Sequence, residues 1–447
     1  MAWLGDACDE VRALTRTETP ADGHVLGGPV WPFGLRGAVD TIGVLFMPSF
    51  VSWVDFSRAD RDRMRKAIAL YAEKETRDEL GLGTVRDAFA DALFPGTSTI
   101  QTRLRYVLLI PWIYTDLERA RKSSKSIGRR ARDAEVALIS VLADSEDSDG
   151  TIGRRSRSDL QRLPSSIYWA ALQRWQICLF AGSREQFHRA FGQLMGRRRS
   201  GLVPDDEGIE SATEHVWHPR FPAPPPGWPD EVSLTLTREE AEFVRGRWAQ
   251  TCAGSLLDHF AQRDFDGDAD WPWATRLQGA LPTGLAEQLD LARRFSLVMH
   301  GASLLYNLLL AERYKDPEKG SAWAEKYRGA LAEWAAAEED EPADLRSFDV
   351  GELWRFTARV EARVPLRTQG FVEAWTGMLR ETDPAAIAGH EPARTLVMHR
   401  EKALKKTRSR FVNQRALDSW KGSSGEARLN YRWGVVSSHL RDLQGAE

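Results

Sequence analysis

The chain has 447 residues, of which 42% are apolar and 28% are charged, and its formal net charge is −3. These proportions are ordinary for globular proteins and exclude a collagen-like chain or one that is disordered throughout. At roughly 100–200 residues per domain, the length predicts about two to four domains. Three cysteines are too few for a disulfide framework and suit a reducing compartment, which favours a cytoplasmic protein.

The N-terminus has neither the basic region nor the apolar region of a signal peptide. The longest uncharged stretch, residues 295–311, reaches only the lower length limit of a membrane-spanning helix and contains His300 and Asn307. A buried core helix is therefore the better interpretation of this stretch, and no membrane partner is expected.

Residues 1–46 differ from the rest of the chain, because they carry a Gly-Gly-Pro run at 27–29 and no sustained hydrophobic period. After Met47, the spacing of Ser57 and Asp60 is typical of a helix start. We interpret 1–46 as an irregular upstream extension from gene annotation, with Met47 as the true start. A genuine irregular arm is the alternative.

Positive charge is concentrated in two segments. Residues 99–200 contain 19 Lys or Arg and 10 Asp or Glu, and residues 394–447 contain 12 and 5. The rest of the chain is strongly acidic, so the near-neutral total hides two basic segments. Such asymmetry predicts a polyanionic partner, in the first place the phosphate backbone of DNA. Solvated basic helices are the alternative.

Residues 47–200 are expected to form a basic helical domain. Short helices are predicted at 134–143, 158–163 and 167–175, with a Pro-Ser-Ser turn before the third. Three helices in this order are typical of a helix-turn-helix or winged-helix-like unit, here at 134–177. An α-helical packing module is the alternative.

In a helix-turn-helix docked on DNA, arginines meet phosphates and polar side chains of the third helix face a groove. Ser165, Tyr168 and Gln173 are the candidates for the groove. The candidates for phosphate contact are Arg129, Arg130, Arg154, Arg155, Arg157 and Arg162.

Residues 201–236 contain the run WHPRFPAPPPGWPD and are predicted to form a Pro-rich linker that divides the chain. A capping box of Thr237 and Glu240 then begins an acidic helical domain at 237–393. The predicted fold class is therefore mainly α, a multi-helical chain in two parts.

Residues 394–447 form a basic C-terminal segment that is rich in aromatic residues. Lys and Arg neutralise phosphates, and aromatic rings can stack on exposed bases. A terminal helix pair docked on the acidic body is the alternative. The aromatic candidates are Phe411, Trp420, Tyr431 and Trp433, and the basic candidates are Lys402, Lys405, Lys406, Arg408, Arg410, Arg428 and Arg432.

Familiar catalytic and cofactor motifs are absent from the sequence. It has no GxxxxGK[ST] loop, no HExxH, no paired CxxC and no GxSxG, so no cofactor or zinc site is predicted. The DFDGDAD run resembles a calcium loop but has Ala269 and Thr275 where Gly and Glu are required. His300 and Asn307 are interpreted as a hydrogen-bonded buried pair. A charged cluster near a pocket is a further possibility, formed by Arg86, Asp87, Arg103 and Arg105.

Several segments resemble an uncharacterised bacterial family known only as a domain of unknown function. They are SWVDFS at 52–57 and the stretches 83–106, 152–169 and 416–433. The resemblance runs from Met47 to the end and implies a domain of about 400 residues. It also implies genes in mobile or phage-defence islands, near helicases and nucleases, and it supplies no catalytic residues.

Three functions follow as hypotheses. The first is a non-enzymatic, DNA-binding accessory subunit of a bacterial defence system, with helicase or nuclease subunits as partners. The second is a metal-dependent nuclease or hydrolase, in which Asp55, Asp87 and Asp91 bind magnesium. The third is a protein-docking scaffold. The missing motifs favour a non-enzyme.

Overall fold

The computed structural model divides the chain into two compact units, residues 1–61 and 62–447, and all described residues belong to the second. The 1–46 extension, Met47, Ser57 and Asp55 lie outside the described residues. The predicted mainly α class is confirmed, because the described residues form helices and only one isolated β-bridge, between Cys178 and Trp217. The described residues are 78–120, 126–200, 215–263, 269–275, 281–340 and 345–446.

The helices of the first half follow the hydrophobic pattern. Val85, Phe89 and Leu93 form the buried face of the first described helix. The next helix begins at Tyr106 and continues through Pro111, which is buried inside it. The helices are α3 (Gly83–Leu93), α4 (Tyr106–Arg119), α5 (Ile127–Asp144), the 3-10 helix η1 (Arg157–Asp159), α6 (Pro164–Arg174) and α7 (Arg184–Ser200).

The second half is also helical. Thr237 and Glu240 form the predicted capping box at the start of α8. The elements are α8 (Arg238–Thr251), α9 (Leu256–Ala261), η2 (Pro272–Ala274), α10 (Thr283–Ala311), α11 (Pro317–Asp340), α12 (Val350–Arg359), α13 (Leu366–Glu381), η4 (Pro384–Gly389), α14 (Glu391–Lys405), η5 (Lys406–Arg408), α15 (Gln414–Asp418) and α16 (Trp433–Gln444).

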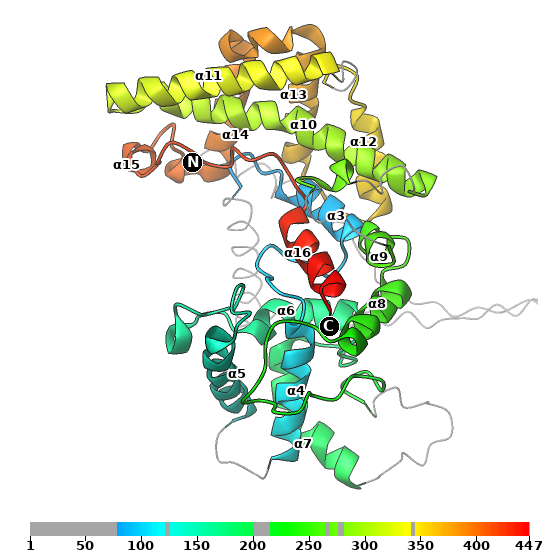
Figure 1. The fold of residues 1–447 in the computed structure, drawn as a ribbon. Coiled ribbons are helices and arrows are strands. Elements are labelled where there is room, and N and C mark those ends of the chain that lie inside the picture. Colours follow the sequence, from blue (N-terminus) through cyan, green and yellow to red (C-terminus); the bar gives the residue numbers. More distant parts are fainter. Residues whose placement is uncertain are drawn as a thin grey trace, which may run out of the picture. The chain divides into compact units, whose positions relative to one another are not determined.

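The long uncharged stretch lies in α10, which runs beside α11 (Figure 1). Gly301 of α10 lies against the ring of Trp334, and the indole of Trp334 donates to the carbonyl of Leu297 at 2.9 Å. Because Gly301 has no side chain, the two helices can approach closely here. The stretch is a core helix, and none of the described helices is long and apolar enough to cross a membrane.

The described part of the Pro-rich segment, residues 215–236, packs onto the helices instead of forming a free spacer. Leu234 and Leu236 are fully buried. The indole of Trp112 in α4 donates to Pro222 O at 2.8 Å, and that of Trp228 donates to Asp116 at 2.6 Å. The tryptophans and leucines among the prolines bury apolar surface and anchor the segment. The domain division at this segment stays a prediction.

The C-terminal segment is part of the core. Tyr431 and Trp433 are buried, and the hydroxyl of Tyr431 donates to Ala292 O at 2.7 Å. Trp420 is buried as well. The expectation that these three rings stack on bases is therefore wrong, because they are enclosed by protein. Docking on the helical body, the alternative interpretation, describes them correctly.

Candidate nucleic-acid interface

The helix-turn-helix interpretation fails at its recognition helix. Ser165 and Tyr168 of α6 are fully buried. The hydroxyl of Tyr168 donates to Arg103 O at 2.8 Å, and the side-chain amide of Gln173 donates to the carbonyls of Phe180 and Gly182. These three side chains hold α6 in the protein and are not available to a DNA groove. No wing hairpin follows α6 in the described residues, so the helices α5, η1 and α6 form a packing module.

Glu135 of α5 explains why α6 begins at Pro164. Its carboxylate accepts hydrogen bonds from the backbone N of Ser165 at 2.8 Å and from the Ser165 hydroxyl at 2.7 Å. A carboxylate from another helix thus caps α6, since the N-cap Leu163 provides no side-chain cap.

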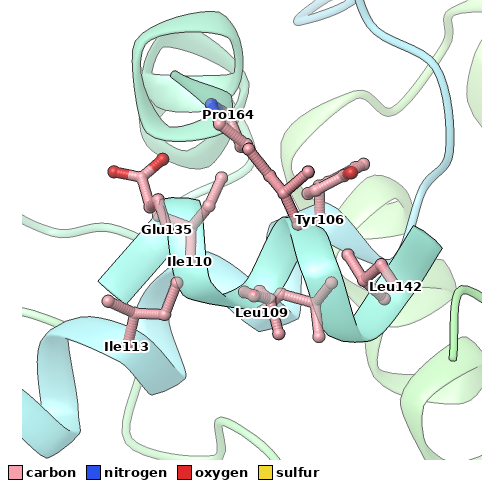
Figure 2. A pocket seen from close by; sticks show the side chains of 9 residues that line it. Tyr106, Leu109, Ile110, Ile113, Glu135, Leu142 and Pro164 are labelled. Atoms are coloured by element: carbon pink, nitrogen blue, oxygen red, sulfur yellow. The ribbon is translucent and has the colours of Figure 1, made fainter. Parts of the chain in front are cut away.

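Figure 2 shows Glu135 among apolar side chains at the junction of α4, α5 and α6. The gap lined by Tyr106, Ile110 and Pro164 is too narrow for a water molecule. Burial raises the pKa of Glu135 to about 7. This gap is a core contact and not a ligand site.

Basic residues after α5 face solvent. The loop from Gly150 to Ser156 leads into η1, and it packs on α5 through Gly153, which lies against Ile139. Arg154, Arg155, Arg157 and Arg162 are exposed on this loop and just after it. Arg157 donates to the Ser140 hydroxyl at 3.3 Å. Arg154, Arg155 and Arg162 have no ion-pair partner within the described ranges.

Arg129 and Arg130 lie in the first turn of α5. Arg129 is exposed, and half-buried Arg130 donates to Leu117 O near the end of α4 at 3.1 Å. The first turn of α5 contains no acidic residue. Cations at a helix N-terminus oppose the helix dipole, so these arginines do not stabilise α5. The exposed N–H groups and guanidiniums there both favour an anion.

Part of the basic C-terminal segment is neutralised inside the protein. Lys405 and Arg410 both form ion pairs with Glu79, which also accepts from the Ser424 hydroxyl. Arg410 donates in addition to the Tyr306 hydroxyl at 2.7 Å. Burial, together with the nearby Arg410, lowers the pKa of Lys405 to about 8.

Two more C-terminal arginines are held by the protein. The Arg428 guanidinium lies 5.4 Å from the ring centre of Trp271 and 5.3 Å from that of Trp273. Arg432 pairs with Asp91 at 2.6 Å and with Asp87 at 3.7 Å. The exposed cations of this segment are Lys406, Arg408, Arg415, Lys421 and Arg441, and Lys402 is half-buried.

A family model matches residues 48–447, and its description is a family of unknown function, DUF6361. The chain belongs to the DUF6361 family. The expected resemblance to an uncharacterised family of about this length is thereby confirmed. No curated protein and no solved structure matches the chain.

The carboxylates of the nuclease hypothesis lie on α3 of this DUF6361 protein. Asp87 and Asp91 are one turn apart and line a pocket of about 1100 Å³. Arg432 neutralises both, and Arg86 donates to Asp87 at 3.0 Å. The described part of the chain contains no group of three or more His, Cys, Asp or Glu residues that could hold a metal ion.

The predicted cluster of four charged residues near a pocket does not form in the DUF6361 structure. Arg86 and Asp87 pair with each other, whereas Arg105 binds Glu240 at 2.7 Å. Arg103 binds Asp147 and Asp442. Each arginine near the start of α4 is therefore neutralised by a carboxylate far away in the sequence.

His300 and Asn307 are hydrogen-bonded, as predicted for a core pair. His300 Nε2 lies 3.0 Å from the carbonyl of Glu426, and the Asn307 amide donates to Ser424 O at 2.8 Å. The calcium-like run begins at 264, and its residues up to 268 lie outside the described residues.

Sequence reasoning missed Glu79 and Glu135, the carboxylates that fix the C-terminal segment and α6. Neither belongs to a recognisable local motif, since Glu79 only follows Asp78 and Glu135 only follows Asp133 by two positions. Only the charge imbalance of the C-terminal segment, which requires acidic partners, pointed towards Glu79.

Proposed function

We propose that this DUF6361 protein binds nucleic acid, in the first place DNA, through the outward arginine set. This set is defined as Arg129, Arg154, Arg155, Arg157 and Arg162. The observation that supports this proposal is that the basic residues of the two basic segments differ in their exposure and in their ion pairs. The outward arginine set faces solvent, whereas four basic residues of the C-terminal segment form ion pairs with carboxylates of the protein, namely Arg394, Lys405, Arg410 and Arg432.

The geometry of α5 suits a polymer more than a small anion. Arg129 lies in the first turn of the helix, and Arg157 contacts Ser140, which is eleven positions after Arg129. At 1.5 Å per residue, these points are about 16 Å apart along the helix. That separation corresponds to about five nucleotide steps along one strand of a duplex.

Carboxylates near the loop are expected to lower the affinity of the outward arginine set for DNA. Asp144 and Asp149 line the same surface hollow as Arg154 and Arg155, and exposed Asp159 follows in η1. The protein is therefore expected to bind DNA by phosphate contact with strong dependence on salt and little sequence preference.

We further propose that the protein has an accessory, non-enzymatic role on DNA. This role is supported by Arg432, which occupies the Asp87 and Asp91 carboxylates that a nuclease would need for magnesium. The defence system and its helicase or nuclease partners stay predictions from the family resemblance.

Fluorescence anisotropy tests the proposal with labelled double- and single-stranded DNA between about 50 and 300 mM salt. The triple variant Arg154→Ala, Arg155→Ala, Arg157→Ala is expected to bind at least about tenfold more weakly at low salt. If each arginine meets one phosphate, the salt slope also falls by up to about three.

The matched control removes the same charge from the C-terminal segment, in Lys402→Ala, Lys406→Ala, Arg408→Ala. It is expected to change affinity by less than about threefold, because these side chains are not part of the outward arginine set. No binding by the wild type at 50 mM salt would contradict the proposal, and so would a larger loss in the control.

A further inference from the structure

The loop between α5 and η1 encloses a surface hollow of about 780 Å³. We call it the loop hollow. Three arginines and two carboxylates line it, together with glycine and hydroxyl residues. Its lining includes Asp144, Asp149, Thr151, Arg154, Arg155 and Arg157.

The backbone of the loop hollow is held in one shape. Gly150 and Gly153 have φ angles of +81° and +82°, which only glycine adopts without strain. A Cβ on Gly153 would lie 2.8 Å from Leu160 Cδ2, and one on Gly150 would lie 2.7 Å from Arg103 Cγ. The Thr102 hydroxyl donates to Gly150 O at 2.6 Å. The loop is thus anchored, while its arginine side chains extend into solvent.

Two features of the loop hollow are unexplained by packing. Arg154 and Arg155 are adjacent cations without an ion-pair partner among the described residues. Thr151 is only 8% exposed, and its hydroxyl has no hydrogen-bond partner in the described structure. A buried hydroxyl without a partner is unfavourable, because it has lost its hydrogen bonds to water, and a ligand that accepts from it removes this cost.

We infer that the loop hollow is a site for one phosphate group, held by the guanidiniums of Arg154 and Arg155, with Thr151 as a further donor. Guanidinium groups bind phosphate oxygens in a bidentate manner, and Arg157 adds positive charge beside them. The inference rests on the proposed function, because the phosphate is taken to be part of a nucleic-acid backbone. Free phosphate compounds have the same chemistry and are tested separately.

Charge-conserving variants separate a shaped phosphate site from general attraction. Arg154→Lys with Arg155→Lys keeps the charge but loses the bidentate geometry. The full-length variant is expected to bind DNA about tenfold more weakly in the anisotropy assay at 100 mM salt. The control Arg408→Lys, on the exposed C-terminal face, is expected to match the wild type.

Thr151→Val tests the hydroxyl at nearly constant volume. Its midpoint of thermal unfolding is expected to equal or exceed that of the wild type, because an unpartnered buried hydroxyl is removed. Its affinity for DNA is expected to fall about threefold to tenfold, since one donor to a charged group is lost. Thr407→Val, at an exposed position, is the matched control.

The source of the phosphate is resolved by calorimetric titration with inorganic phosphate and with a deoxynucleoside 5′-monophosphate. Wild-type DNA binding that survives both the lysine variant and Thr151→Val overturns the phosphate site and leaves the proposed function intact. A second outcome is that the small phosphates bind saturably to the wild type and not to the variants, while DNA does not bind at all. That outcome overturns the proposed function and keeps the loop hollow as a site for a free phosphate compound. Absence of all binding overturns both.

Discussion

Arg103 and Asp442 are 339 positions apart in the sequence, and their side chains form an ion pair with 2.7 Å between Arg103 Nε and Asp442 Oδ1. The other carboxylate oxygen of Asp442 accepts from the backbone N of Leu104 at 2.7 Å. Arg103 also binds Asp147 through two nitrogens and donates to Asp149 O at 3.1 Å. One guanidinium thus connects the C-terminal helix α16 to the loop hollow.

Asp442→Ala is expected to lower the free energy of unfolding by about 3 kcal/mol, because Arg103 then loses a buried partner. The midpoint of urea unfolding measures this change. Hydrogen exchange of the loop at 147–153 is also expected to accelerate. The control Asp418→Ala, which removes an exposed pair with Lys315, is expected to leave the midpoint unchanged. Equal midpoints in the two variants would contradict the anchoring role.

Glu135→Gln is expected to remove the contribution of Glu135 to the pH dependence of stability. The pKa of Glu135 is raised by burial from 4.5 to about 7, so the folded state binds more protons than the unfolded state between these values. Stability therefore rises as pH falls from 7 to 4.5, by about 3 kcal/mol in total. Urea unfolding of wild type and variant at several pH values measures the difference, and parallel pH profiles would refute it.

His439 is expected to have the opposite effect. Burial lowers its pKa from 6.5 to about 3, so the unfolded chain binds the proton first and stability is lost as pH falls below 6.5. Between pH 6.5 and 5 the loss is about 2 kcal/mol. His439→Phe removes this loss and two ring nitrogens that lack partners within the described chain. A variant that is still destabilised by acid to the wild-type extent would refute the assignment.

Because Glu135 and His439 act in opposite directions over overlapping pH ranges, their contributions partly cancel in the wild type. Each single variant is expected to show a steeper pH dependence than the wild type. The double variant restores a shallow profile if the two sites are independent.

Glu79→Ala is expected to destabilise the protein by about 3 kcal/mol, since it leaves Lys405 and Arg410 without their shared carboxylate. Lys406→Ala, one position further along the chain and exposed, is the control and is expected to have little effect. Chemical unfolding followed by tryptophan fluorescence measures both variants. A neutral Glu79→Ala variant would mean that these cations are free for a partner.

Local patterns in the sequence predicted much of the fold. The capping box of Thr237 and Glu240 marked the start of α8, and the uncharged stretch at 295–311 indicated the core helix that the structure shows as part of α10. These features depend on residues that are close together in the sequence. Apolar runs and capping are local, so they are readable without tertiary structure.

The direction of the basic side chains was not predictable in the same way. Counting charges in the C-terminal segment cannot show that Lys405 faces Glu79, more than 300 positions earlier. The same holds for Ser165, whose partner Glu135 is on another helix. Aromatic residues among basic ones suggested base stacking, whereas burial placed Trp433 in the core. Contacts between residues far apart in the sequence decide whether a basic or aromatic side chain is buried or exposed. The composition of a segment does not show these contacts.

The ion pair of Arg103 and Asp442 also sets an order for biosynthesis. The first helices emerge from the ribosome long before α16 has been made. During that time Arg103 and the backbone N of Leu104 lack the Asp442 carboxylate that binds them in the complete chain. The N-terminal helices cannot reach their final packing until residue 442 has left the ribosome. Nascent chains halted before α16 should therefore be more sensitive to protease than the released protein, and they depend more on chaperones during synthesis.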